Sequence, residues 1–300
     1  MNMKKIYSFF GLVAVGGLAA TFTGCESESQ IYEGPSYVMF ADTMNVCPVF
    51  QEDKAYEVPL SATQVMPYDR TFAVEVLQQK SNAIEGYHYT IESNTVTVPA
   101  GEPATSVKIK GNYEHIEEDD SLNIRLRLVL LDEKQEWDYY GLETNVSFQK
   151  ICPFDINAYT GYAIVSSTFL YTYNHGNLRR LITTERVEGE ENTVLLRDFM
   201  SDGYDVKLTF DNSDPLRPRA SVEEGAIIAP TEQYIGTMLG DNMLRIADYA
   251  DIESRFMPCR NLAALYSLVF VYKEGYLGAF ATTVEWISDV EAEDILKNGF

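Results

Sequence analysis

An alternation of apolar and polar side chains with a period of two runs through the first half of the chain and restricts this half to β-structure. It is clearest over residues 122–130, where leucine and isoleucine alternate with Asn123, Arg125 and Arg127. Successive side chains of a strand point to opposite faces of a sheet, so this stretch is predicted to be a half-buried strand. Further short strands are predicted at residues 37–40, 56–60, 72–76, 96–98, 107–109 and 146–148. Seven or so antiparallel strands with proline- and glycine-containing turns between them indicate an immunoglobulin-like sandwich.

Part of this half resembles Calx-beta-like domains, over about residues 35–150. The segments that carry the resemblance are residues 85–89, 94–102, 107–109 and 116–122. The resemblance implies a Greek-key sandwich, and in calcium-binding members acidic loops at one end hold Ca²⁺. This chain has His88 where an Asp is usual, and Gly-Asn-Tyr at residues 111–113 where paired Asp residues are common. Because Ca²⁺ takes six to eight oxygen ligands, we predict no metal site and interpret the acidic residues 117–120 as a solvated turn.

The second half is also predicted to be mostly β. Its candidate strands are residues 161–173, 178–187, 193–197, 205–210, 226–228, 243–247, 265–272, 277–283 and 284–287. This number and spacing of strands predict a second β-sandwich or a lipocalin-like β-barrel, followed by one short helix at residues 290–297. Pro153 cannot donate to a sheet ladder and marks a linker. We therefore expect one domain over residues 35–151 and another over residues 152–300, so that the whole fold is all-β.

The first 24 residues have the features of a secretory signal peptide. Lys4 and Lys5 precede an apolar run, residues 6–20, that is too short to span a bilayer. Thr-Phe-Thr-Gly-Cys at residues 21–25 resembles the lipobox of bacterial lipoproteins, which implies that Cys25 is lipidated and becomes the first mature residue. The alternative is an ordinary signal peptide with a chance Gly-Cys pair.

The residues after this cysteine resemble an export signal of Bacteroidetes-type lipoproteins. They read Cys-Glu-Ser-Glu-Ser over residues 25–29 and form the start of a polar tether over residues 25–34. The resemblance implies a protein that is held in the outer membrane by the lipid on Cys25 and displayed on the cell surface.

The charge of the chain excludes nucleic acid as a partner. The net charge is -22, and removal of Lys4 and Lys5 with the signal peptide makes it -24. So large an excess of carboxylates repels phosphate backbones. A neutral glycan or a protein remains as a possible ligand, and the outer membrane is contacted through lipid alone.

Three cysteines remain after Cys25. Cys47, Cys152 and Cys259 allow at most one intrachain disulfide, and none has the C-x-x-C spacing of redox or zinc sites. The favoured interpretation is three buried thiols that pack as small apolar side chains.

The common catalytic motifs are absent from the sequence. It has no G-x-S-x-G, H-E-x-x-H, P-loop or G-x-G-x-x-G pattern, and its three histidines, His88, His115 and His175, are scattered. We therefore predict no catalytic residues and no cofactor. Glycoside hydrolysis needs only two carboxylates, so a glycan hydrolase within residues 153–300 stays an alternative.

Clusters of aromatic residues are the candidate ligand-binding groups. Trp137, Tyr139 and Tyr140 interrupt the period of two, and Tyr171 and Tyr173 lie with Phe169 on one side of a predicted strand. Such rings can stack on the C–H faces of sugars, although core or cross-strand packing is the more common use of large aromatics. The function predicted is that of a non-catalytic cell-surface lipoprotein that binds an extracellular ligand, a glycan foremost, for a nutrient-uptake system. A structural or adhesive surface component is the alternative.

Overall fold

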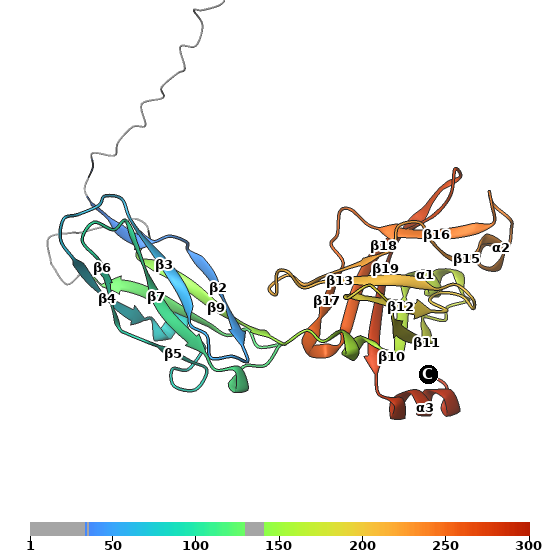
Figure 1. Ribbon diagram of the computed structural model, residues 1–300, viewed down its shortest axis with the longest axis horizontal. Helices are drawn as coiled ribbons and strands as arrows, with labels where there is room; N and C mark the ends of the chain where they lie inside the picture. Colours follow the sequence, from blue (N-terminus) through green and yellow to red (C-terminus); the bar gives the residue numbers. More distant parts are fainter. Residues whose placement is uncertain (1–33, 35, 130–140) are drawn as a thin grey trace, which may run out of the picture.

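The computed structural model describes residues 34, 36–129 and 141–300. Their strands form two β units that lie end to end, joined by the segment that follows β9 (Figure 1). The all-β prediction, with a sandwich first and a second β-structure after it, is confirmed. Cys25 lies outside the described residues, as do Trp137, Tyr139 and Tyr140. Within the described ranges, every helix is too short or too polar to cross a bilayer.

The first unit is a sandwich of two sheets. One sheet contains, in spatial order, β1 (Val38–Phe40), β3 (Tyr56–Ala62), β7 (Ala104–Gly111) and β5 (Tyr89–Ile91). The other contains β2 (Met44–Phe50), β9 (Glu143–Ile151), β8 (Asn123–Val129), β4 (Arg70–Val76) and β6 (Thr95–Val98). Two 3-10 turns, η1 (Gln78–Lys80) and η2 (Tyr113–His115), lie in its loops. The alternating side chains of both sheets, such as Leu60, Ile109 and Leu126, meet in one buried core.

Strand β2 is a feature that the sequence analysis missed. It pairs with β9 in parallel, over seven residue pairs from Met44↔Asn145 to Phe50↔Ile151, whereas only antiparallel pairs were predicted. Pro48 weakens the strand signal, because proline cannot donate to a ladder. It is tolerated here because β2 is the edge strand of its sheet.

The second unit is a closed barrel of eight antiparallel strands. Its members in order are β10 (Gly161–Ser167), β11 (Arg179–Arg186), β12 (Thr193–Arg197), β13 (Val206–Asp211), β14 (Arg219–Val222), β17 (Arg255–Met257), β18 (Leu262–Val271) and β19 (Gly275–Ile287). The barrel closes because β19 pairs with both β10 and β18. Of the two predicted architectures, the barrel is therefore the one observed. Strand β19 is continuous where two strands were predicted, and β14 and β17 were missed.

The remaining elements decorate the barrel. Strand β16 (Met243–Asp248) pairs with the C-terminal half of β18, and β15 (Ala226–Pro230) pairs with β16. The short helices are η3 (Ile156–Tyr159), α1 (Thr168–Tyr173), α2 (Thr231–Ile235) and η4 (Pro258–Arg260). Helix α3 (Asp289–Asn298) confirms the predicted C-terminal helix, and Ser288 and Glu291 form a capping box at its start.

The prediction of one strand over residues 161–173 is wrong in its second part. Strand β10 ends at Ser167, whose Oγ accepts a hydrogen bond from the Phe169 amide at 3.2 Å and so caps α1. In a helix, residues two apart point in different directions. Phe169 is consequently buried and Tyr171 is 61% exposed on another side of the helix, whereas Tyr173, one turn after Phe169, lies with its ring 5.2 Å from that of Phe169 against the barrel core.

The prediction of three free thiols is wrong for two of them. Cys152 and Cys259 form a disulfide, with Cα atoms 5.2 Å apart, because the end of β9 and the η4 turn meet at the junction of the two units. Cys47 is a buried free thiol in β2, and burial raises its pKa to about 12.

Each unit has its own apolar core. One hydrophobic cluster draws its buried residues from 38–148 and the other from 159–286. We propose that residues 35–151 and 152–300 are separate folding domains, after a signal peptide at residues 1–24 and a tether at 25–34.

Candidate functional site

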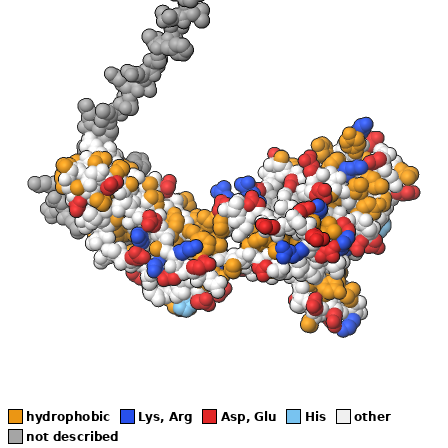
Figure 2. Space-filling view, in the orientation of Figure 1, with side chains coloured by type: hydrophobic (Ala, Val, Ile, Leu, Met, Phe, Trp, Pro, Cys, Tyr) orange, Lys and Arg blue, Asp and Glu red, His pale blue; other side chains and the backbone are white. Residues whose placement is uncertain are grey.

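A cavity of about 480 Å³ opens at the end of the sandwich that adjoins the barrel. We call it the sandwich pocket. Three segments form its walls, namely residues 50–53 from the end of β2 onward, residues 86–90 up to the start of β5, and residues 110–114 at the end of β7 and the start of η2. In Figure 2, hydrophobic side chains gather on this end of the sandwich, facing the barrel.

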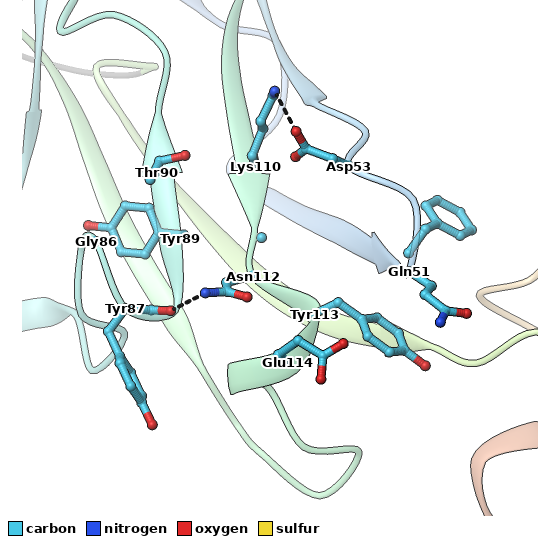
Figure 3. A pocket seen from close by; sticks show the side chains of 12 residues that line it. Gln51, Asp53, Gly86, Tyr87, Tyr89, Thr90, Lys110, Asn112, Tyr113 and Glu114 are labelled. Carbon is cyan, nitrogen blue, oxygen red and sulfur yellow. Dashed lines mark hydrogen bonds and ion pairs between the residues drawn. The ribbon is translucent and has the colours of Figure 1, made fainter.

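The sandwich pocket combines exposed rings with hydrogen-bonding side chains. Tyr87 is 50% exposed and stacks on His115, with ring centroids 4.0 Å apart and an interplanar angle of 10°. Figure 3 shows Tyr87 and Tyr113 on either side of Asn112. The polar groups of the lining are Gln51, Asp53, Thr90, Lys110, Asn112 and Glu114. Rings beside amides, hydroxyls and charges are what a small polar ligand with an apolar face requires.

Hydrogen bonds hold the loop that carries Tyr87. The Asn112 side-chain amide donates to the Tyr87 carbonyl oxygen at 3.1 Å, and His115 Nδ1 lies 2.9 Å from the same oxygen. His88 Nδ1 accepts from the Ile84 amide at 2.9 Å. The first two contacts use the backbone carbonyl of Tyr87, while one face of its ring is covered by His115.

The floor of the sandwich pocket is tightly packed. Tyr89 is 1% exposed, stacks on Phe148 at 5.4 Å, and has a pKa raised to about 12, mainly by burial. Beside it, a Cβ atom on Gly111 would lie 2.3 Å from Cγ2 and 3.1 Å from Cβ of Val49. Only glycine therefore fits at position 111 without displacing the edge strand β2.

Replacing Gly111 with Ala is expected to lower the free energy of unfolding of the sandwich by about 1–3 kcal/mol, the usual cost of overpacking. Val49→Ala should relieve the clash, so the double variant should be less destabilised than the two single variants added together. Urea unfolding followed by circular dichroism measures all three. Strict additivity would contradict the packing argument.

Tyr113 connects the sandwich pocket to the junction. Its hydroxyl donates to Cys152 Sγ at 3.4 Å, and Lys150 Nζ lies 4.5 Å from its ring centroid. Burial, with a smaller effect of Glu114, raises the pKa of Tyr113, so the hydroxyl stays a donor at neutral pH.

The acidic turn at residues 117–120 is more than the solvated turn that was predicted. Arg260 of the barrel pairs with Glu118 at 2.8 Å and with Asp119, and Glu117 lies 3.9 Å from Lys150. The reason is that the turn faces η4, which the disulfide places beside it. Within residues 36–129 and 141–300, no group of three His, Cys, Asp or Glu side chains is arranged to hold a metal ion.

The predicted ligand-binding residues do not form this pocket. Trp137, Tyr139 and Tyr140 are outside the described residues, and Tyr171 and Tyr173 belong to α1 of the barrel. The sequence analysis did not select the residues of the sandwich pocket, although the sequence contains one sign of them. The departure from the Calx-beta pattern at residues 111–113 falls on the pocket wall.

A family model described as Domain of unknown function (DUF4984) matches residues 139–298, which is more than half of the chain. The chain belongs to this family. The match covers the last strand of the sandwich and the whole barrel. No curated protein matches the chain.

Several solved structures are similar to the DUF4984 chain at low identity. One is a protein of unknown function from Bacteroides ovatus, with 10% identity, a TM-score of 0.36, and coverage of 83% of this chain and 89% of that chain. An auxiliary nutrient binding protein from Bacteroides thetaiotaomicron has 14% identity and a TM-score of 0.29, with 80% and 90% covered. CBD12 from CALX1.2 has 12% identity and a TM-score of 0.32, with 62% and 79% covered.

Proposed function

We propose that this protein is a non-catalytic, cell-surface lipoprotein that binds a glycan in the sandwich pocket, as part of a nutrient-uptake system. The observation that carries the proposal is the composition of that pocket. Its lining brings Tyr87, which is 50% exposed and whose carbonyl oxygen accepts from Asn112, together with Tyr113 and Glu114 around a cavity large enough for a sugar unit.

The chemistry of a sugar matches these groups. A pyranose has a flat face of C–H bonds, which suits an aromatic ring, and a rim of hydroxyls, which suits amides and carboxylates. Gln51 offers a donor and an acceptor to such a rim and Asn112 offers its side-chain oxygen, while the Lys110–Asp53 pair, 3.1 Å apart, can contribute without requiring charge in the ligand.

The location of the protein is a separate part of the proposal. It rests on the signal-like residues 1–24 and on the Gly-Cys pair that precedes the acidic tether. Replacing Cys25 with Ala should release the protein from membrane fractions into the soluble fraction. An Ala variant that still needs detergent for extraction would count against lipidation. Protease accessibility on intact cells tests surface display.

Replacing Tyr87 with Ala is expected to weaken glycan binding about two- to tenfold, because one ring contact contributes about 0.5–1.5 kcal/mol. The backbone carbonyl of Tyr87 keeps its hydrogen bonds in this variant. A glycan array with residues 30–300 finds the ligand, and titration calorimetry then compares the variants. Tyr68→Ala is the matched control, since Tyr68 is 56% exposed and lies outside the pocket lining. Absence of binding to any glycan, or equal losses in both variants, would favour a structural or adhesive role.

A further inference from the structure

Two more cavities lie between the sandwich pocket and the barrel, and each shares lining residues with the next. A junction cavity of about 350 Å³ uses Tyr113, which also lines the sandwich pocket. A barrel cavity of about 350 Å³ shares Lys150, Cys152 and Cys259 with the junction cavity. In Figure 3, the ring of Tyr113 extends from the sandwich pocket toward the barrel. We call this row of three cavities, from the sandwich to the barrel, the track.

We infer that this track takes an extended, neutral oligosaccharide, with one end in the sandwich pocket and later sugars over the disulfide and against the barrel. This inference rests on the proposed function and adds the size and charge of the ligand. Its first support is the order of the cavities, because each shares a lining residue with the next and a chain of sugars can contact them in turn.

The second support is the rigidity of the junction. The Cys152–Cys259 disulfide and the pairing of Arg260 with Glu118 join the two units at the middle of the track. Both units therefore present their parts of the track in one arrangement before a ligand arrives. Binding across two units is then not opposed by the entropy of ordering them.

The third support is the barrel wall of the track, which is apolar and stiff. Leu216 lies between Pro215 and Pro218, and Phe256 closes the wall from β17. Proline fixes the backbone φ angle, so this loop has few conformations to lose on binding. Apolar side chains of this kind suit the C–H faces of sugars better than they suit charged groups.

The charge of the ligand follows from the ion pairs along the track. The basic side chains at the track are each paired with a carboxylate. The pairs are Lys110–Asp53 at 3.1 Å, Lys150–Glu117 at 3.9 Å, Arg260–Glu118 at 2.8 Å and Arg255–Glu253 at 3.1 Å. A uronate in the ligand would have to displace one of these carboxylates, and the net charge of -22 would repel it.

The test uses series of neutral oligosaccharides of increasing length, about two to six hexoses, drawn from α- and β-linked glucans and mannans. A series of oligogalacturonides of the same lengths is the acidic probe. Titration calorimetry on residues 30–300 should show affinity that rises with length in a neutral series and little binding of the acidic series. Leu216→Ser should weaken the longest neutral ligand about fivefold and leave the shortest unchanged, whereas Tyr87→Ala should weaken both. Leu296→Ser, an exposed position on α3, is the control and should change neither.

The outcomes separate this inference from the proposed function. Equal affinity for all lengths, with Tyr87→Ala still harmful, would overturn the track and keep the sandwich pocket as a glycan site. A gain with length that Leu216→Ser does not reduce would also overturn the track. Equal binding of the acidic series would overturn the neutral assignment. No binding at any length would overturn both the track and the glycan-binding function.

Discussion

Replacing both Cys152 and Cys259 with Ser is expected to lower the free energy of unfolding of the barrel by about 2–5 kcal/mol. The disulfide joins residues 107 apart, and the loop that it closes contains every barrel strand from β10 to β17. In the chain-entropy model, a loop of about 100 residues restricts the unfolded chain by about 4.7 kcal/mol at 25 °C, which sets the upper end of the range.

Urea unfolding measures this effect and tests the domain proposal at the same time. Two separate folding domains should give two transitions, of which only the barrel transition moves in the double Ser variant. A reducing agent should shift the wild-type barrel transition to the same position and leave the variant unchanged. A wild-type barrel that unfolds at the same urea concentration with and without the disulfide would contradict the prediction.

Replacing Trp286 with Ala is expected to destabilise the barrel by about 3–5 kcal/mol, as large aromatic-to-Ala changes in cores do. Trp286 is 7% exposed and its ring lies 4.9 Å from that of Tyr159, in a cluster of rings within the barrel core. The other rings of this cluster are Phe154, Phe210 and Phe256. The Trp286 indole N–H also donates to Thr184 Oγ1 at 2.9 Å, and the substitution removes this buried bond.

Thermal unfolding followed by far-ultraviolet circular dichroism checks the prediction. Trp286→Phe should lose less stability, because it keeps most of the ring contacts and loses the hydrogen bond. Tyr276→Ala is the control, since Tyr276 is 73% exposed on β19 and should change the free energy of unfolding by at most about 0.5 kcal/mol. Similar losses for Trp286→Ala and Tyr276→Ala would argue that the ring cluster is not a core.

The sandwich could be predicted from sequence because its signal is local. Ile124, Leu126 and Leu128 alternate with polar residues and are all buried in the structure, as the period of two requires. The choice between a sandwich and a barrel for the second half could not be made in this way. Barrel closure depends on β19 pairing on both sides, and strand pairing between distant segments leaves no mark on either strand alone.

Local signals also compete with one another. Aromatic and β-branched residues favour strands, which led to the wrong strand over Thr168–Tyr173, while Ser167 supplied a helix cap in the same segment. The cap and the burial of Phe169 against the barrel core decided the outcome. The disulfide could not be assigned either, because three cysteines allow three pairings and a separation of 107 residues favours none.

The candidate site was the least predictable part. Trp137 and its neighbours were chosen because they interrupt the period of two, and they lie outside the described residues, whereas the sandwich pocket draws Asp53, Tyr87 and Asn112 from three separate loops. Only the fold brings these loops to one end of the sandwich. The departure from the Calx-beta pattern at residues 111–113 falls on the wall of this pocket, whereas Tyr171 and Tyr173 lie on α1 of the barrel.

The parallel pairing of β2 with β9 also determines how the sandwich responds to tension. The described chain begins at the end of the sandwich away from the barrel, and β9 leads directly into the barrel (Figure 1). A pull between these two ends acts along β2 and β9 in opposite directions and loads the evenly spaced hydrogen bonds between them together, in shear. Hydrogen bonds loaded in this way must break simultaneously, whereas those of a hairpin pulled at its open end break one after another. Tension between the two ends of the sandwich would therefore act on the strand pair that is best oriented to resist it.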